Sequence, residues 1–304
     1  MKILVIGAGG VGGYFGGRLL EKGEDVTYLV REGRQKQLQD LGLDIESIHG
    51  NALLHPKTIL AGEEAGPFDV ILLTTKSYNL DSAIKDIRPY VTEETVILPL
   101  LNGILHFETL DKEFGADKVI GGLCFVESTL DSKGRIIQTS PGHDFVFGER
   151  SGEKTERILK IADAFSGTKA NFRLSENISQ DLWHKYMFIS TMSGITTLMR
   201  QPIGPIRETE SGNHTIKRLQ SEIFKIMKSV DAPIAEEIES MQMKQIAGLG
   251  YTMKSSMQRD MEKLAQVEVE HLHGYLLVIA QREKLNVPVL ESVYANLKIY
   301  QEQL

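Results

Sequence analysis

The sequence predicts an α/β protein, with an N-terminal Rossmann-like, doubly wound domain followed by an all-helical C-terminal domain. Three observations support this prediction. Short aliphatic runs alternate with helical patterns in the first half, a glycine-rich turn follows the first of those runs, and strand-like runs become scarce after about residue 177. Near-continuous apolar strands are typical of a parallel sheet covered by helices on both faces. We therefore expect a dinucleotide-binding domain over residues 1–176 and a helical substrate and catalytic domain over residues 177–304.

Composition narrows the class of protein. The chain has 304 residues, 41% of them hydrophobic and 25% charged, with 34 basic and 41 acidic side chains and a net charge of −7. This length provides cores for about two domains, and the acidic balance argues against nucleic acid or an anionic membrane as partner. The single cysteine, Cys124, excludes an internal disulfide and a cysteine-based zinc site. We expect a cytoplasmic protein without a bound metal.

The expected elements of the first half follow from apolar runs and punctuating glycines. A helix is expected over Gly12–Lys22, because its apolar spacing is helical and Gly23 suits the position after a helix end. Val119–Cys124 and Asp144–Phe147 are expected to extend the same sheet, the second of them in an antiparallel sense. The four expected buried strands are Lys2–Ile6, Asp25–Val30, Val70–Thr75 and Thr95–Leu100.

The second half carries helical apolar spacing and no low-complexity linker. The helices expected there are Gln180–Met199, Thr215–Val230, Ala235–Ile246 and Lys263–Glu283.

A GxGxxG run joins the first strand to the first helix. In this run, Gly7-Ala8-Gly9-Gly10-Val11-Gly12, the first glycine permits a tight turn, the second allows close approach of a pyrophosphate, and the third allows the helix to pack on the strand. Backbone N–H groups and the positive end of the helix dipole then face the phosphates. These six residues are the expected dinucleotide-binding loop.

The end of the second strand indicates which dinucleotide binds. An acidic residue there would hold a ribose 2′-hydroxyl, whereas this strand ends at Val30 and is followed by Arg31, with Arg34 nearby. A guanidinium can hold a 2′-phosphate, so Arg31 favours NADP (as NADPH) and Arg34 could add a second donor. Glu32 keeps NAD open as the alternative.

Several further motifs follow the glycine loop in a fixed order. With the loop, they are Arg31, Thr75-Lys76, Leu101-Asn102-Gly103, Leu182-Trp183-His184-Lys185, the run Ser255–Asp260, and Glu268. No motif after the glycine loop is specific alone, but their joint order and spacing are. Taken in this order, they resemble the ketopantoate reductases (2-dehydropantoate 2-reductases) over almost the whole chain.

The resemblance implies roles for single residues. Lys185 matches the family's proton donor, and the apolar residues around it suggest a packed segment rather than a solvated one. Glu268 matches a glutamate near that lysine and the cofactor. The alternative without a function is that Glu268 is a solvated charge on a helix surface. Asn102 is expected to contact the nicotinamide end or the substrate, and Lys76 a cofactor phosphate or ribose. Ser256 is expected to bind the substrate carboxylate, although serines at a helix start are commonly caps.

Some positions depart from the family pattern. Pantoate-forming members carry asparagines where this chain has Ile189, Ser193 and Ile203. Ser193 stays in the expected substrate-binding set, but the two isoleucines remove donors on which substrate discrimination would depend. Ser128 aligns only loosely with a cofactor contact and is not included among the expected site residues.

The resemblance implies an oxidoreductase that reduces a small 2-keto acid with NADPH. The first expected substrate is ketopantoate, whose reduction belongs to pantothenate biosynthesis. The expected partner is that small molecule, and a homodimer is one assembly option. Two alternatives stay open. One is a 3-hydroxyacid or polyol-phosphate dehydrogenase, against which Ile189 counts; the other is a non-catalytic NADP-sensing protein, which the missing asparagines favour.

Overall fold

A computed structural model describes all residues, 1–304. The chain divides into two compact units. The first comprises Met1–Leu101 and His106–Ser179, and the second comprises Asn102–Leu105 and Gln180–Leu304. The first is an α/β unit and the second is helical, which confirms the predicted fold class. No helix combines the length and the apolar character needed to cross a membrane.

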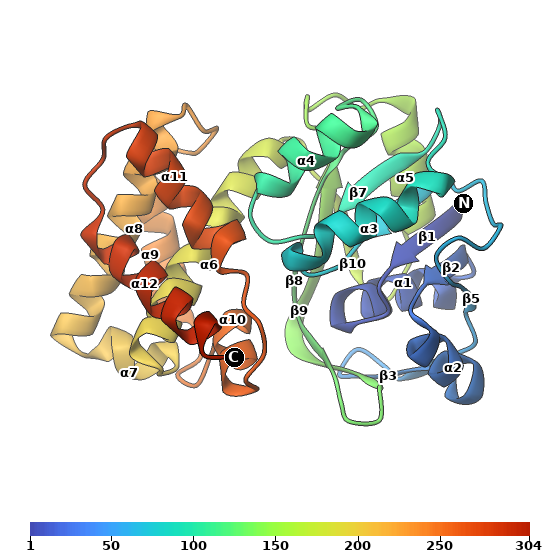
Figure 1. Ribbon diagram of the computed structural model, residues 1–304, viewed down its shortest axis with the longest axis horizontal. Helices are drawn as coiled ribbons and strands as arrows, with labels where there is room; N and C mark the ends of the chain where they lie inside the picture. Colours follow the sequence, from blue (N-terminus) through green and yellow to red (C-terminus); the bar gives the residue numbers. More distant parts are fainter. The chain divides into compact units, whose positions relative to one another are not determined.

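A five-stranded parallel sheet forms the frame of the first unit, in the order β5-β2-β1-β6-β7 (Figure 1). The predicted buried strands all lie in it, within one or two residues of the expected ends. Each of β1, β6 and β7 is almost wholly buried, as expected for a sheet covered on both faces. Its strands are β1 (Lys2–Ile6), β2 (Asp25–Leu29), β5 (Lys57–Ile59), β6 (Val70–Leu73) and β7 (Val96–Pro99).

A second sheet was not predicted. It has the order β10-β9-β3-β4, with β8 paired to β9 in an antiparallel sense. The expectation that Val119–Cys124 and Asp144–Phe147 extend the parallel sheet is therefore wrong, apart from one bridge between Val119 and Ile97. The long β8–β9 hairpin pairs with itself, and β3 then joins its side. The strands are β3 (Leu43–Ser47), β4 (Ala52–Leu54), β8 (Gly121–Leu130), β9 (Ile136–Gly148) and β10 (Asn171–Leu174).

The first helix, α1 (Gly10–Lys22), contacts strands of both sheets. Its glycines explain how it fits there. A Cβ at Gly16 would meet Tyr28 and Val5 of the parallel sheet, whereas a Cβ at Gly17 would meet Ile45 and Leu43 of the second sheet. The helix ends as predicted, with Gly23 at φ 110°. The other helices of this unit are α2 (Glu32–Leu41), α3 (Leu80–Ile87), α4 (Leu105–Phe114) and α5 (Glu156–Phe165), with short 3₁₀ turns η1 (Ser77–Asn79) and η2 (Arg88–Tyr90).

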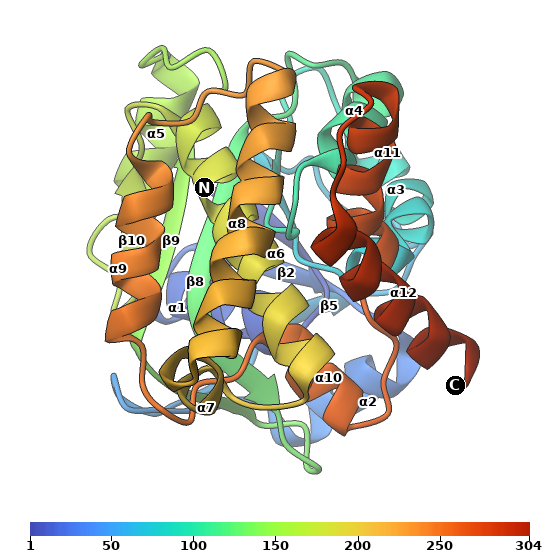
Figure 2. The same ribbon diagram turned by 90° about the vertical axis from the view of Figure 1, so that its left-hand side faces the viewer.

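The second unit packs its helices around a separate core of buried aliphatic and methionine side chains. The long α8 runs between α9 on one side and α11 and α12 on the other (Figure 2). Its elements are α6 (Ile178–Met199), α7 (Ile203–Glu208), α8 (Glu210–Ser229), α9 (Ile238–Gly248), α10 (Ser256–Glu262), the π-helix η3 (Glu270–Gly274), α11 (Tyr275–Arg282) and α12 (Pro288–Glu302).

One predicted helix of this unit starts too early. Lys263–Glu283 is not continuous, because α10 ends at Glu262 and helical structure resumes only at Val269. Leu264 adopts φ 53°, and the Ala265 N–H donates to the Asp260 carbonyl, which closes α10 with a left-handed C-terminal residue. Glu268 therefore stands at the start of the next helical run, where its carbonyl accepts from the Leu272 N–H at 3.1 Å.

Candidate active site

The carboxyl edge of the parallel sheet gathers the predicted cofactor residues of the first unit. Ile6 is in register with Leu29 of β2 and with Leu73 of β6, so the chain leaves three adjacent strands at one level. Gly7 follows β1, Arg31 lies just beyond β2, and Lys76 lies just beyond β6. Ligands of open α/β sheets bind at this edge, where neighbouring loops diverge.

The glycine loop has the geometry that a pyrophosphate requires. Gly7 has φ 95°, a left-handed conformation suited to glycine. Gly9 precedes α1, and a Cβ built on it would have no atom within 4 Å, so the space above this residue is open. At Gly12 the opposite holds, because a Cβ would collide with the Gly7 carbonyl and the Thr74 hydroxyl. Thr74 Oγ1 also donates to the carbonyls of Ile6 at 2.7 Å and Gly7 at 3.1 Å.

The two arginines after β2 lie in different environments. Arg31 is exposed, and its guanidinium makes no hydrogen bond or ion pair within the protein. Arg34 is partly buried: Nε donates to the Ala8 carbonyl at 3.2 Å, and Nη1 donates to the Gly134 carbonyl at 2.8 Å and to Gln37 Oε1 at 2.6 Å. Arg34 thus joins the glycine loop to the turn of the β8–β9 hairpin, which the sequence did not indicate.

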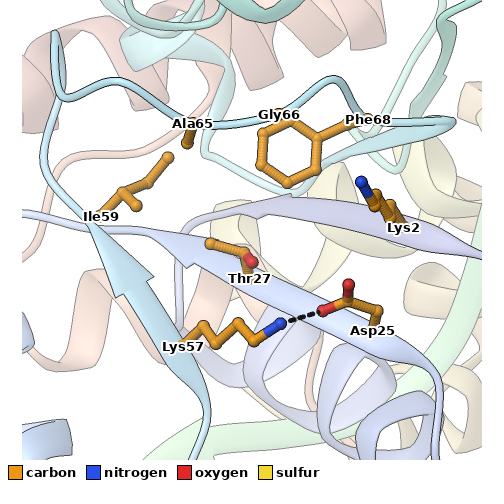
Figure 3. Close-up of a pocket in the computed structure, with 8 residues that line it drawn as sticks. All are labelled: Lys2, Asp25, Thr27, Lys57, Ile59, Ala65, Gly66 and Phe68. Carbon is orange, nitrogen blue, oxygen red and sulfur yellow. Dashed lines mark hydrogen bonds and ion pairs between the residues drawn. The ribbon is translucent and has the colours of Figure 1, made fainter.

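A pocket of about 260 Å³ lies elsewhere in this unit (Figure 3). Lys2, Asp25 and Lys57, the first residues of β1, β2 and β5, line it, so it opens at the amino-terminal edge of the sheet. Lys57 Nζ and Asp25 Oδ1 form an ion pair of 2.7 Å across it. None of the predicted site residues lines this pocket, and its edge is the one opposite to the glycine loop.

Lys185 of the second unit is buried, with 7% of its surface exposed. It lies in the middle of α6 among buried residues that include Leu182, Tyr186 and Phe188, as the apolar flanks suggested. Burial of a lysine is costly unless the ammonium is partnered or used in function. Lys185, Ile189 and Ser193 follow at intervals of four residues, so they share one face of the helix.

The residue before Lys185 has a structural role. His184 Nε2 accepts a hydrogen bond from the Ala235 N–H at 3.0 Å, and its carbonyl accepts one from Gln242 Nε2 at 2.7 Å. Burial lowers the pKa of His184, which keeps the ring neutral and able to accept. These contacts fix α6 against α9 and the segment that leads into it.

Asn102 and Glu268 meet within the second unit, although 166 positions separate them. The Asn102 Nδ2 donates to Glu268 Oε2 at 3.4 Å. Glu268 is buried, with 7% of its surface exposed, so it is not a solvated charge on a helix surface. The structure therefore joins two of the predicted site residues directly.

The two predicted substrate serines differ in exposure and in their contacts. Ser256 opens α10 with an exposed side chain, and it is Ser255 that caps that helix by accepting from the Gln258 N–H at 3.1 Å. Ser193 is buried in α6. Neither serine side chain hydrogen-bonds to Asn102, Lys185 or Glu268.

A Rossmann-like unit with a glycine loop, followed by a helical unit with a buried lysine and a buried carboxylate, defines a class of two-domain oxidoreductases. Residues 3–152 match the family model described as ketopantoate reductase PanE/ApbA, and residues 177–301 match the model of the C-terminal part of the same family. The chain belongs to the ketopantoate reductase family, which confirms the resemblance seen in the sequence.

Related proteins agree with this assignment. The chain is 49% identical over 303 residues, spanning 100% of both proteins, to a Bacillus subtilis (strain 168) protein named uncharacterized oxidoreductase YkpB. The crystal structure of 2-dehydropantoate 2-reductase from Geobacter metallireducens GS-15 has a TM-score of 0.89 at 27% identity, covering 98% of this chain and 99% of that one. D-mandelate dehydrogenase, solved with NADH and anilino(oxo)acetate, shares the fold, with a TM-score of 0.88 at 18% identity and coverage of 100% and 99%.

Proposed function

We propose that this protein reduces a small 2-keto acid to the 2-hydroxy acid with NADPH, and that 2-dehydropantoate, which yields pantoate in pantothenate biosynthesis, is the first substrate to test. The observation that carries the proposal is the buried Lys185 on α6, at the position that matches the proton donor of the family. A buried ammonium suits the reduction of a ketone, because the product alkoxide needs both a proton and a compensating positive charge.

The first unit fits a dinucleotide. The open space above Gly9 admits a pyrophosphate next to the backbone, and the start of α1 presents N–H groups to it. The exposed Arg31, without a partner of its own, is suited to a 2′-phosphate and so favours NADPH over NADH. Lys76, just beyond β6, supplies a further positive charge at the same edge of the sheet. NADH is the competing cofactor, since the D-mandelate dehydrogenase of the same fold was solved with it.

The proposed chemistry divides between the cofactor and this chain. The cofactor, when bound, supplies the hydride that adds to the keto carbon. Lys185 donates a proton to the keto oxygen and offsets the negative charge that develops there, an effect of general acids that is typically worth about 10²–10⁴-fold in rate. The Asn102 amide, held by Glu268, orients the substrate or the nicotinamide end, and Glu268 contributes a carboxylate to the site.

Three replaced positions bear on the choice of substrate. Ile189 lies one helical turn after Lys185, and Ile203 is fully buried in the apolar core, so neither can donate a hydrogen bond to a substrate hydroxyl. Ser193 and Ser256 supply the hydroxyls for substrate binding in this proposal. These replacements favour a 2-keto acid with fewer polar groups near the carbonyl than ketopantoate has.

The test is NADPH oxidation, followed by absorbance, across a panel of 2-keto acids that includes ketopantoate and larger apolar members. We expect turnover of at least one acid, and we expect it to depend on Lys185. Reduction of NADP⁺ with 3-hydroxyacids or polyol phosphates instead would support the dehydrogenase alternative. Tight NADPH binding without turnover of any panel member would support the sensing alternative.

A further inference from the structure

The turn formed by Asn102 and Gly103 belongs to the helical unit, although it follows β7 in the sequence. Gly103 adopts φ 77° and packs against the π-helix η3. A Cβ built on Gly103 would lie 3.1 Å from the His271 carbonyl oxygen and 3.2 Å from the His271 ring carbon Cδ2. Such distances are shorter than those of most real Cβ contacts. The Gly103 backbone therefore packs directly against His271.

His271 also holds the turn through a hydrogen bond. Its ring N–H donates to the backbone carbonyl of Asn102, while the Asn102 side-chain amide donates to Glu268 at 3.4 Å. Asn102 is therefore held at both ends, its main chain by one residue and its side chain by another. Both holding residues come from the short segment 268–271, so they place Asn102 as a unit.

The segment that carries His271 is π-helical. The π-helix η3 (Glu270–Gly274) is also bonded to α6, because the Tyr186 hydroxyl donates to the Leu272 carbonyl at 2.6 Å. Tyr186 follows Lys185 directly on α6. Single π-helical turns occur frequently at functional sites because they re-aim side chains within a helix.

We propose that His271 is a positioning residue, which sets the Asn102 amide beside Glu268 for the reaction assigned to this site. This inference rests on the proposed function for its meaning in catalysis, but the positioning is a property of the structure alone. Burial lowers the pKa of His271 although the Glu268 carboxylate opposes the change, so the ring is neutral near pH 7. A neutral ring has one N–H, and the Asn102 carbonyl fixes which nitrogen carries it.

Kinetics of His271 variants test the catalytic side of the inference. His271→Phe keeps an aromatic ring but loses the donor, and we expect about a tenfold lower kcat/KM for the best 2-keto acid with NADPH affinity unchanged, the scale of one lost hydrogen bond. His271→Gln restores an N–H and should recover most of that loss. Glu270→Gln is the matched control, because this exposed neighbour bonds Tyr294 and Lys298 rather than the turn.

A double-variant comparison separates positioning from general stabilisation. If His271 acts through Asn102, His271→Phe should cost little in an Asn102→Ala background. An equal loss in both backgrounds would overturn the inference. If His271→Phe does not fold, as judged by circular dichroism, His271→Leu takes its place, since it also lacks a donor and crowds Gly103 less.

A second readout does not depend on activity. Asparagine followed by glycine can lose ammonia when the glycine nitrogen attacks the side-chain carbonyl carbon; water then opens the cyclic imide to aspartate or isoaspartate. The Asn102 carbonyl and the Gly103 nitrogen share one peptide group, so holding the carbonyl restrains the attack. His271→Phe should speed this conversion at Asn102, as measured by peptide mass spectrometry, while His271→Gln and Glu270→Gln should not.

The two readouts distinguish failure of the inference from failure of the proposed function. Unchanged deamidation in both His271→Phe and His271→Leu would overturn the positioning role. Faster deamidation in a protein that reduces no 2-keto acid would uphold the positioning role and reject the proposed function.

Discussion

The hydroxyl of Ser128 donates a hydrogen bond of 2.9 Å to the carbonyl of Gly10. This contact brings the β8–β9 hairpin onto the glycine loop, and it is close, because a Cβ at Gly10 would collide with the Ser128 backbone. Arg34 reinforces the contact by bonding Ala8 of the loop and Gly134 of the hairpin turn. The predicted dinucleotide loop is thus held from outside by a strand pair that comes more than 100 residues later.

Arg31→Ala should weaken NADPH binding and leave NADH binding nearly unchanged. The exposed guanidinium has no partner in the protein, so its removal costs only its bond to a 2′-phosphate, about 1.5–3 kcal/mol for a charged hydrogen bond. Titration by nicotinamide fluorescence measures both affinities. Equal NADPH and NADH affinities in the unmodified protein would contradict this and favour Glu32 as a ribose-binding carboxylate.

Arg34→Ala should behave differently from Arg31→Ala, weakening NADPH and NADH by similar factors of about tenfold. Its Nε and Nη1 bond the glycine loop, the hairpin turn and Gln37, so its loss loosens the pyrophosphate cradle rather than a 2′-phosphate site. The same fluorescence titration is the measurement. A loss confined to NADPH would show instead that Arg34 is the second phosphate donor that the sequence suggested.

Gly9→Ala and Gly12→Ala should separate cofactor binding from stability. Gly9 has φ −86° and open space beside it, so alanine there should leave the melting temperature unchanged while blocking the pyrophosphate. Gly12→Ala places a methyl group against the Gly7 carbonyl and Thr74, an overpacking that costs about 1–3 kcal/mol of unfolding free energy. Thermal unfolding and cofactor titration of both variants check this. A destabilised Gly9→Ala protein would refute the open space at that residue.

Local signals in the sequence predicted much of the parallel sheet and the place of the glycine loop. The parallel strands, the glycine loop and the end of α1 at Gly23 each depend on residues within a few positions of one another. The second sheet does not depend on neighbouring residues, because β3 pairs with β9 across about 90 residues. The end of α10 was missed for another reason: its left-handed residue is Leu264, where glycine or asparagine would have signalled a helix end.

Long-range contacts also explain which features of the candidate site could not be predicted from the sequence. Ser128 could be matched only loosely, because its meeting with Gly10 depends on the hairpin folding over the loop. The sequence predicted His271 to be an ordinary helical residue. Nothing in the sequence indicates the π-helical turn or the hydrogen bond between His271 and Asn102. Lys185 and Glu268 were predicted as site residues through family resemblance, and the structure adds that both are buried.

Lys185→Ala should abolish turnover and leave NADPH affinity unchanged, because the proposed proton donor acts on the substrate and the glycine loop holds the cofactor. We expect a loss in kcat of at least about 10²–10⁴-fold. Lys185→Arg should rescue poorly, since a guanidinium is larger and does not release a proton near neutral pH. Steady-state kinetics with the best panel substrate and fluorescence titration are the measurements. Near-normal kcat in Lys185→Ala would remove the proposed mechanism.

His273 should make the fold sensitive to acid. Its Nε2 bonds the Ser190 carbonyl at 2.9 Å, whereas its buried Nδ1, which would take up a proton, has no partner. Burial lowers the pKa of His273 from 6.5 to about 4. Because the unfolded chain then binds the proton more readily, His273 costs no stability above pH 6.5. As the pH falls to about 4, it removes on the order of 3 kcal/mol of unfolding free energy.

His273→Gln keeps an N–H donor but does not titrate. Urea unfolding between pH 7.5 and 4 should therefore show a shallower loss of stability in this variant. The residual slope belongs to other groups, including His143, His184 and His271, whose pKa values burial also lowers. Identical pH profiles for the two proteins would show that His273 is not the buried group that limits stability in acid.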